Sequence, residues 1–272
     1  RYICYKTEDA IDVDGHLQEE AWARAPRSPR FGDHTGQRSL FDTRAAMLWD
    51  DQNFYVGFWM EDRDVCGAEE EDPLSARQDN NAGVLLVGRG AYYELAVNPL
   101  GATSEMFHIW KEAYQRGGRY DVPEFDLAVH RPEVLGGGSN SDYRAMRWAF
   151  SHWRFPGLQV GVQVEGTLNK RDDIDQGWSV ELAFPWEGLK RLADAQSLPP
   201  AAGDVWRIGV VRRQIIDQRA SRRQVLWTWQ PLIESNMHVP ETHLEVEFSR
   251  VPPGESAANK DGAWNWPFPG RG

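Results

Sequence analysis

The protein has 272 residues, with 41 acidic and 30 basic side chains and a formal net charge of −11. This balance argues against nucleic acids and anionic membranes as partners, because binding to phosphate groups requires clustered Lys and Arg side chains. A chain of this length can bury a core without a disulfide or metal staple, and an all-β protein of roughly 250 residues can form a single domain.

The predicted elements, taken along the chain, are mainly short strands separated by turn signals. Two short helices are candidates, over 17–25 and over 185–194, the second beginning with Pro185. Two hairpins are predicted, one over 45–62 with an Asp-Asp-Gln-Asn turn and one over 82–101 that turns between Gly88 and Gly90. Further strands are predicted over 158–169, 177–186, 204–216, 224–229 and 243–250. The pattern is typical of an all-β sandwich or barrel, here with one or two short helices.

The domain organisation expected from these elements is one β-sandwich over 1–250. An insertion at about 126–152 combines a flexible polar patch with an apolar run that could be helical, and 251–272 form a tail rich in Pro, Gly and Trp. No apolar run is long enough to span a membrane, so membrane insertion is not expected. Cys4 and Cys66 could form one disulfide or remain two thiols, and two small apolar strand residues are the favoured interpretation.

Two glutamates lie inside predicted strands, where a charged side chain is costly unless it faces water or a partner. Alternation in 178–184 places Trp178, Val180, Leu182 and Phe184 on the core face, so Glu181 points away from the core toward solvent or a second face. The same alternation in 92–98 directs Tyr93, Leu95 and Val97 inward and Tyr92, Glu94 and Asn98 outward.

Several motifs in order resemble one known family. They are "YICYKT", "IDVDGHLQEEAW", "MLWDDQNFYVGFWMED", "YYELAVNPLG", "GTLNKRDDIDQGWSVELAFPW" and "PPAAGDVWRIGVVR", followed by "WTWQP" and "HVPE". Together they resemble carbohydrate-binding family 9-like proteins, a DOMON-like β-sandwich group often associated with endoxylanases. The resemblance covers about residues 2 to 250. It implies an all-β fold that is a two-sheet antiparallel β-sandwich of the DOMON-like or jelly-roll type, sugar binding, calcium as a structural ion, and an extracellular or periplasmic location.

The sequence departs from the family at the sugar clamp, which in the family is formed by two aromatic rings. The equivalent places fall near Ala76 and Met237, and neither is aromatic. A family Glu falls near Gly83 and a family basic residue near Ala96. The clamp is therefore expected to be absent or rebuilt, and the fold carries over more safely than the ligand.

The sugar-binding candidates are aromatic faces with polar partners, because sugars stack on flat apolar rings and hydrogen-bond through hydroxyls. Trp227 and Trp229 lie two apart and so share one face, either core or platform. Trp148 and Trp153 in the insertion could supply a replacement clamp. The chosen candidates are Trp110, Asn98, Tyr92, Trp227, Trp229 and His238.

Two alternatives involve other chemistry. Glu94 and Glu181 could form a glycosidase pair, roughly 5 to 9 Å apart, although ordinary structural carboxylates are the favoured interpretation. Asp173 and Asp175 could bind calcium in an acidic turn, with a solvated turn as the other interpretation. A haem held by Met237 and His238 is not expected, because adjacent strand residues point to opposite faces, and no organic cofactor is predicted.

The expected function is therefore non-catalytic binding of a polysaccharide, such as xylan, or of its chain end, with a glycoside hydrolase as partner. A glycoside hydrolase using the Glu pair is the first alternative. A scaffold domain that has lost sugar binding is the second.

Overall fold

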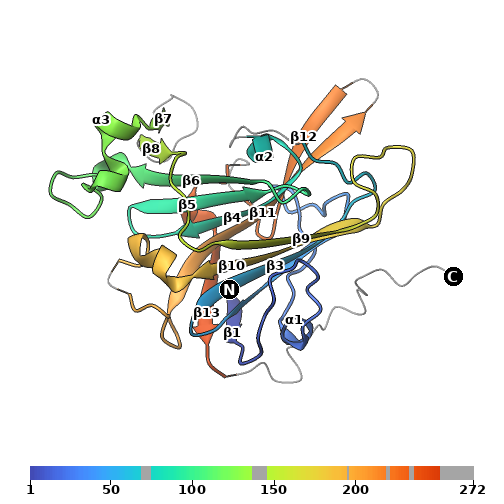
Figure 1. The fold of residues 1–272 in the computed structure, drawn as a ribbon, viewed down its shortest axis with the longest axis horizontal. Helices are drawn as coiled ribbons and strands as arrows, with labels where there is room; N and C mark the ends of the chain where they lie inside the picture. The colour runs from blue at the N-terminus through green and yellow to red at the C-terminus, as the bar shows by residue number, and fades with distance from the viewer. Residues whose placement is uncertain (69–74, 137–145, 195, 219–220, 233–235, 252–272) are drawn as a thin grey trace.

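The computed structural model describes residues 1–68, 75–136, 146–194, 196–218, 221–232 and 236–251. Strands dominate, with only short helices at the periphery (Figure 1). The strands are β1 (Tyr2–Lys6), β2 (Thr43–Trp49), β3 (Asn53–Glu61), β4 (Asn81–Val87), β5 (Ala91–Val97), β6 (Thr103–Trp110), β7 (Glu133–Leu135), β8 (Arg147–Phe150), β9 (Gln159–Glu165), β10 (Gly177–Pro185), β11 (Val205–Gln218), β12 (Ser221–Thr228) and β13 (Leu244–Ser249).

The strands form one continuous hydrogen-bonded path rather than two separate sheets. The order is β7-β8-β6-β5-β4-β11-β13-β1-β2-β3-β10-β9, and β12 pairs with β11. The path folds over, so that one half faces the other across the core, as the contact between Tyr93 on β5 and Phe184 on β10 shows, with ring centroids 6.4 Å apart. The mostly β, two-layer expectation is confirmed in this coarser form.

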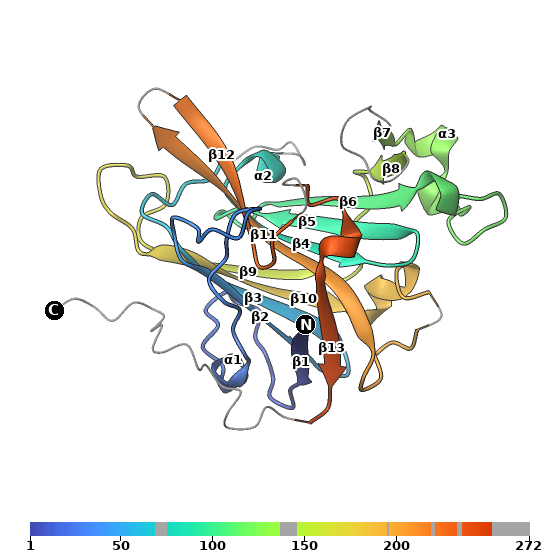
Figure 2. The same cartoon turned by 180° about the vertical axis from the view of Figure 1, so that it is seen from behind.

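The expectation of a purely antiparallel fold is wrong at one strand. β1 pairs in parallel with β13 on one side and with β2 on the other. β1 therefore joins the two halves of the path, and the remaining pairs are antiparallel. Figure 2 shows β1 and β13 side by side.

The core between the halves contains the residues that alternation selects. Trp178, Val180, Leu182 and Phe184 of β10 are buried there with Tyr93, Leu95 and Val97 of β5. This arrangement confirms the predicted core faces. It leaves the alternate residues of both strands on the two outer faces of the sandwich.

Each outer face carries a smaller apolar cluster. The face of β2, β3 and β10 is covered by the segment that contains α1 (Glu20–Arg24), with Leu17 and Trp22 buried against Tyr55 and Trp59. Met237 and Leu232 cover part of the other outer face, which is formed by β4, β5, β6 and β11. There they pack against Leu85, Tyr92, Trp110 and Val211.

The hairpins and helices predicted from local sequence signals agree with the structure better than the prediction for the insertion. The two hairpins and the helix within 17–25 are confirmed, and residues 186–191 form the 3-10 helix η3 (Trp186–Arg191). The apolar run in the insertion is not helical: β8 pairs with β6, for example Trp148 with Ile109, and α3 (Leu127–His130) precedes it. Non-local pairing thus overrides local propensity here. The remaining helices are α2 (Ser75–Gln78), η1 (Lys111–Ala113), η2 (Pro123–Phe125) and η5 (Pro240–Thr242).

Both cysteines are free thiols: Cys4 is buried and Cys66 is half-buried. None of the helices in the described ranges combines the length and apolar character needed to cross a membrane. The polar patch at 137–145 and the predicted tail from residue 252 onward lie outside the described residues.

Candidate functional site

Polar side chains gather on the outer face of β4, β5 and β6. We call this group the outer-face cluster; it consists of Arg77, Tyr92, Glu94, His108, Arg147, Arg213 and His238. Tyr92 and Glu94 point outward because Tyr93 and Leu95 enter the core. On β6 the same alternation turns His108 outward between the core residues Phe107 and Ile109. Arg147 on β8 lies beside Trp110, its partner in the strand register.

The centre of the outer-face cluster is a contact among a carboxylate, two imidazoles and a phenol. His108 Nε2 lies 2.9 Å from Glu94 Oε2, and His238 Nδ1 lies 4.0 Å from the same oxygen. Tyr92 Oη is 2.9 Å from His238 Nδ1. The rings of Tyr92 and His108 stack with centroids 4.3 Å apart. Glu94 and His108 are buried, whereas the His238 side chain remains 17% exposed, so His238 connects the cluster to solvent.

The protonation states follow from burial and from the neighbouring charges. Burial by itself raises the pKa of Glu94, but the hydrogen bond with His108 and the positive charge of Arg77 outweigh it and hold the pKa well below its usual range. Burial lowers the pKa of His238 to about 3, and the charges of Arg147 and Arg77 act in the same direction. Burial also lowers the pKa of His108. The cluster therefore holds an ionised carboxylate and neutral imidazoles at neutral pH.

A groove of about 240 Å³ opens beside the outer-face cluster. β11, β12 and the turn that contains His238 form its walls, and its lining residues are Arg213, Gln224, Val225, Leu226, Asn236, Met237 and His238. About 10–15 Å³ of such space holds one water molecule, so the groove has room for a ligand the size of a sugar ring.

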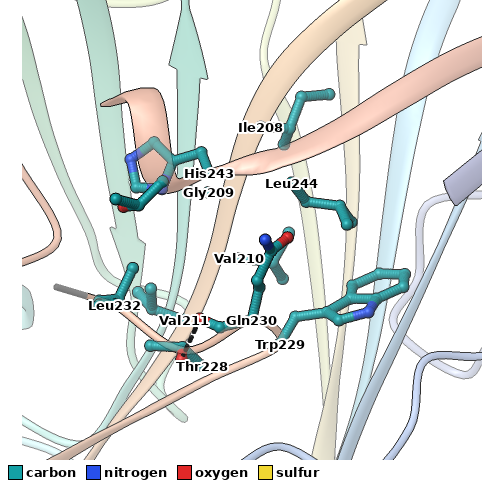
Figure 3. A pocket seen from close by; sticks show the side chains of 11 residues that line it. Ile208, Gly209, Val210, Val211, Thr228, Trp229, Gln230, Leu232, His243 and Leu244 are labelled. Carbon is teal, nitrogen blue, oxygen red and sulfur yellow. Dashed lines mark hydrogen bonds between the residues drawn. The ribbon is translucent and has the colours of Figure 1, made fainter. Parts of the chain in front are cut away.

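A second cavity, drawn in Figure 3, is far smaller. It measures about 10 Å³ and is lined by Gly209 and its neighbours on β11, together with Trp229 and His243. Roughly one water molecule fits a space of this size. This cavity is therefore too small for an organic ligand, and the groove beside His238 is the candidate site.

Some predicted sugar-binding residues belong to the site and others do not. Tyr92 and His238 meet in the outer-face cluster. Trp110 contacts Tyr92, with ring centroids 5.8 Å apart, but only 2% of it is exposed, so it cannot serve as a stacking platform. Asn98 lies elsewhere, where its Oδ1 accepts hydrogen bonds from the backbone N–H groups of Leu100 and Ala102 and stabilises a turn.

The other tryptophan candidates contribute to packing. Trp227 is buried against Phe41, with centroids 6.1 Å apart, and Trp229 packs against Tyr2 at 5.0 Å. Both rings emerge on one face, and that face is the core. Trp153 is also in the core, and Trp148 packs on Tyr114 at 5.2 Å. No aromatic side chain of the described ranges is exposed.

Glu94 and Glu181 lie on opposite outer faces of the sandwich, because each alternates with residues of the shared core. Glu181 faces the N-terminal segment, where it accepts hydrogen bonds from Trp22 Nε1 at 2.6 Å and from the backbone N–H of Gly15 at 3.1 Å and Asp14 at 3.2 Å. Burial raises the pKa of Glu181 to about 7. With the core between the two carboxylates, they cannot flank one glycosidic bond, so the proposed glycosidase pair is wrong.

Side chains of the metal-ligating kind gather at two places. Asp175 accepts hydrogen bonds from the backbone N–H groups of Val65 and Thr167, both at 2.7 Å, and Asp173 lies 3.5 Å from Lys170 Nζ. Within the described ranges, the one group of three metal-ligating side chains is Glu94, His108 and His238, whose ligand atoms lie within 4.8 Å of one another. Calcium binding by Asp173 and Asp175 stays a prediction.

The places equivalent to the family clamp are closed or changed. Ala76 is buried, Ala96 is 5% exposed, and a side chain at Gly83 would approach Val211 to 2.7 Å. Met237 and His238 lie in a turn rather than a strand. Both line the same groove, so the expectation that they point to opposite faces is wrong.

Sequence reasoning missed His108 and the three arginines of the outer-face cluster. His108 could have been found, because "EMFHIW" alternates in the same way as the neighbouring strand. Arg77, Arg147 and Arg213 are contributed by α2, β8 and β11, so only the folded topology brings them together.

The fold and the outer-face groove define a mostly β, two-layer protein with a polar groove on one outer face. No protein-family model and no curated protein matches the sequence. The solved structures of similar fold include a carbohydrate-binding module family 9 from Caldicellulosiruptor kristjanssonii, in complex with cellotriose (TM-score 0.50, 10% identity, 94% of this chain and 97% of that chain). A carbohydrate-binding module family 9 from the same organism, in complex with glucose, matches with TM-score 0.50 and 12% identity over 93% of this chain and 99% of that chain.

A third similar structure is a putative carbohydrate-binding protein from Bacteroides uniformis, with TM-score 0.50, 11% identity, and coverage of 91% of this chain and 98% of that chain. The chain therefore has the fold of carbohydrate-binding module family 9 over more than nine-tenths of its length.

Proposed function

We propose that the protein binds one end of an oligosaccharide in the groove beside His238 and does not cleave it. The observation that carries the proposal is the position of this groove next to a preorganised polar cluster. The fold similarity also supports sugar binding, since structures of similar fold were solved with cellotriose and glucose bound.

The groove offers the two kinds of contact that a sugar ring needs. Gln224, Asn236 and His238 provide amide and imidazole groups for hydroxyls, and Val225, Leu226 and Met237 provide apolar surface for the C–H faces. Met237 takes the place of a flat aromatic ring. A thioether adapts to irregular apolar surfaces but stacks less well, so modest affinity is expected.

The separation of Glu94 and Glu181 supports binding rather than hydrolysis. A retaining or inverting glycosidase needs two carboxyls within about 5–9.5 Å on either side of the bond. The hydrogen bonds of Glu181 are made within its own outer face, to Trp22 and to the segment before it. We therefore expect sugars to be returned intact.

The test is calorimetric titration with glucose, xylose, cellotriose and xylotriose, with product analysis of the same mixtures. We expect saturable heat without cleavage. His238→Ala should weaken binding about tenfold or more, since it removes a groove wall and a hydrogen-bonding group. His16→Ala is the matched control, because His16 lies beside Gly15 and Leu17 on the opposite outer face.

Two results would contradict the proposal. Cleavage products would indicate an enzyme, and an absence of heat with every neutral and acidic sugar would favour a scaffold domain. The absence of an exposed aromatic platform from the described ranges is the observation that favours the scaffold alternative.

The proposal also covers the kind of polysaccharide, the location of the protein, its partner and its metal ion. We propose that the ligand is a plant-type polysaccharide such as xylan, that the protein acts outside the cytoplasm beside a glycoside hydrolase, and that calcium has a structural role. Thermal unfolding with and without a chelator tests calcium: a lower melting temperature in the chelator would support the role, and an unchanged one would remove it.

A further inference from the structure

The outer-face cluster contains three guanidinium groups and one carboxylate. With Glu94 ionised and both imidazoles neutral, Arg77, Arg147 and Arg213 leave it with a net positive charge. The protein as a whole carries −11, so this cluster differs in sign from the chain around it. A buried or half-buried positive group without an anionic partner costs free energy, which suggests that a ligand supplies the missing negative charge.

Arg213 is the guanidinium that lines the groove itself. Its hydrogen-bond partners are uncharged: Gln224 Oε1 at 3.1 Å and Met237 Sδ at 3.7 Å. Among the described carboxylates none lies within ion-pair distance of it. These two neutral contacts fix the planar group against the groove wall, where it can donate to an incoming acceptor.

Arg77 and Arg147 supply the remaining charge from either side. Arg77 Nε lies 3.4 Å from Glu94 Oε1, while one of its terminal nitrogens contacts Met106 Sδ at 3.8 Å. Arg147 is only 6% exposed, lies 5.5 Å from the centroid of the Trp110 ring, and has a buried Nε without a hydrogen-bond partner in the described part of the chain. Among the described residues of the cluster, Glu94 is the one carboxylate, and of the three guanidinium groups only that of Arg77 is in ion-pair contact with it.

The same geometry disfavours a metal ion at Glu94, His108 and His238. Their ligand atoms are close enough, but a cation there would lie among three guanidinium groups. Arg77 and His108 already contact the two oxygens of Glu94. Coulomb repulsion is strongest where water is excluded, so the cluster favours an anion over a cation.

We infer that the groove beside Arg213 binds a sugar that carries a carboxylate, a uronic acid at the end of an oligosaccharide. This inference rests on the proposed sugar-binding function and names its ligand class. A carboxylate matches the two-pronged geometry of a guanidinium, and hydrogen bonds between ionised groups are about twice as strong as neutral ones. Asn236, Gln224 and His238 then face the hydroxyls of the same ring.

The test compares glucuronate with glucose and with the methyl ester of glucuronate, which keeps the shape but not the charge. We expect glucuronate to bind about 10- to 100-fold more tightly than either neutral sugar, from one or two charge-assisted hydrogen bonds. Raising the salt concentration should weaken glucuronate binding and leave glucose binding unchanged.

Arg213→Gln should remove most of the preference for glucuronate while binding of glucose persists. Arg207→Gln is the matched control, because Arg207 lies on the same strand and face, six residues or about 20 Å away, and pairs with Glu245 at 3.1 Å. Circular dichroism of both variants checks that each is folded.

The outcomes separate this inference from the proposed function. Equal affinity for glucuronate, its ester and glucose would overturn the uronic acid inference and leave sugar binding intact. Acetate competing as well as glucuronate would show a plain anion site and overturn the sugar part. No binding of any sugar, neutral or acidic, would overturn both.

Discussion

Arg212 is a fully buried cation that ties the two halves of the sheet path together. From β11 its Nη1 donates to Thr43 Oγ1 on β2 at 2.8 Å and to the Glu61 carbonyl on β3 at 2.7 Å. Its Nη2 donates to Asp62 at 3.1 Å and to Gln214 Oε1 at 2.5 Å. A planar group with several donors fits this position, because each bond goes to a different strand or loop.

We predict that Arg212→Met destabilises the fold by about 3–5 kcal/mol, because it leaves the buried carboxylate of Asp62 without its partner. Urea unfolding followed by fluorescence measures the change as a lower midpoint at constant slope. Arg207→Met removes an exposed pair with Glu245 and should cost about 1 kcal/mol or less. Equal effects in the two variants would show that Arg212 does not tie the halves together.

Glu181 gives a pH dependence with a definite sign. Its pKa rises from 4.5 to about 7 on folding. Its contribution to stability is therefore fully present below pH 4.5 and is lost as the pH rises through 7. We predict that the stability of the wild type minus that of Glu181→Gln falls by about 1–3 kcal/mol between pH 4.5 and 8. Unfolding of both proteins across this range measures it, and a rising difference would contradict the prediction.

At the residue scale, the sequence predicted which way a side chain points better than which residues it contacts. Alternation alone located the outward-facing Tyr92, Glu94 and Glu181. The partners of these residues come from strands or loops far along the chain, and a single sequence does not reveal which distant residues meet. Trp110 shows the limit: β6 was not among the predicted strands, and the residues that cover Trp110, such as Leu232 and Met237, lie far along the chain.

At the element scale, the N-terminal segment over β3 and β10 depends on glycines in the strands beneath it. Gly57 and Gly161 are the register neighbours of Glu181 on either side. A Cβ on Gly161 would lie 2.6 Å from the Asp14 carbonyl carbon and 2.7 Å from the Val13 carbonyl oxygen. The absence of side chains at these positions lets the segment lie close enough to reach the Glu181 carboxylate.

We predict that Gly161→Ala destabilises the protein by about 1–3 kcal/mol, since overpacking displaces the segment. The segment around residues 11–25 should also become more susceptible to proteolysis. Gly67→Ala is the control, because its added methyl group meets no atom closer than 3.3 Å. Equal proteolysis of wild type and Gly161→Ala would show that the segment does not need the close approach.

Elements with local signals were the predictable ones. The Asp50–Asn53 and Gly88–Gly90 turns carry their own chemistry, so both hairpins followed from sequence. The strand β8 has no such signal and depends on its pairing with β6. Its apolar run fitted a helix as well as a strand, because short apolar runs do not separate the two.

At the scale of the whole molecule, β1 decides whether the sheet path is continuous. It lies between β13 and β2, with Tyr2 paired to Val246 and Tyr5 to Leu48. Tyr2 Oη also donates to the Met47 carbonyl at 3.0 Å, and the Cys4 carbonyl accepts from Trp49 Nε1 at 3.1 Å. Its parallel pairs could not be predicted, since strand order is not visible in alternation.

We predict that deletion of residues 1–6 abolishes the folded monomer, because it exposes the unpaired edges of β13 and β2 and opens the core. Size-exclusion chromatography and circular dichroism should show aggregates or an unfolded chain. Deletion of Arg1 alone removes only exposed ion pairs with Glu245 and Glu247 and should have little effect. A cooperatively folding monomer without residues 1–6 would contradict the prediction.

The position of β1 also has a consequence for biosynthesis. Of the described strands, β1 comes first along the chain and its partner β13 comes last, so their parallel pairing cannot form until residues 244–249 have been synthesised. Long-range pairing of this kind is slow, because the chain loses the entropy of closing a large loop before any stabilising contact forms. Nascent chains that stop short of residue 244 should therefore keep one side of β1 open, and they should depend on chaperones during synthesis.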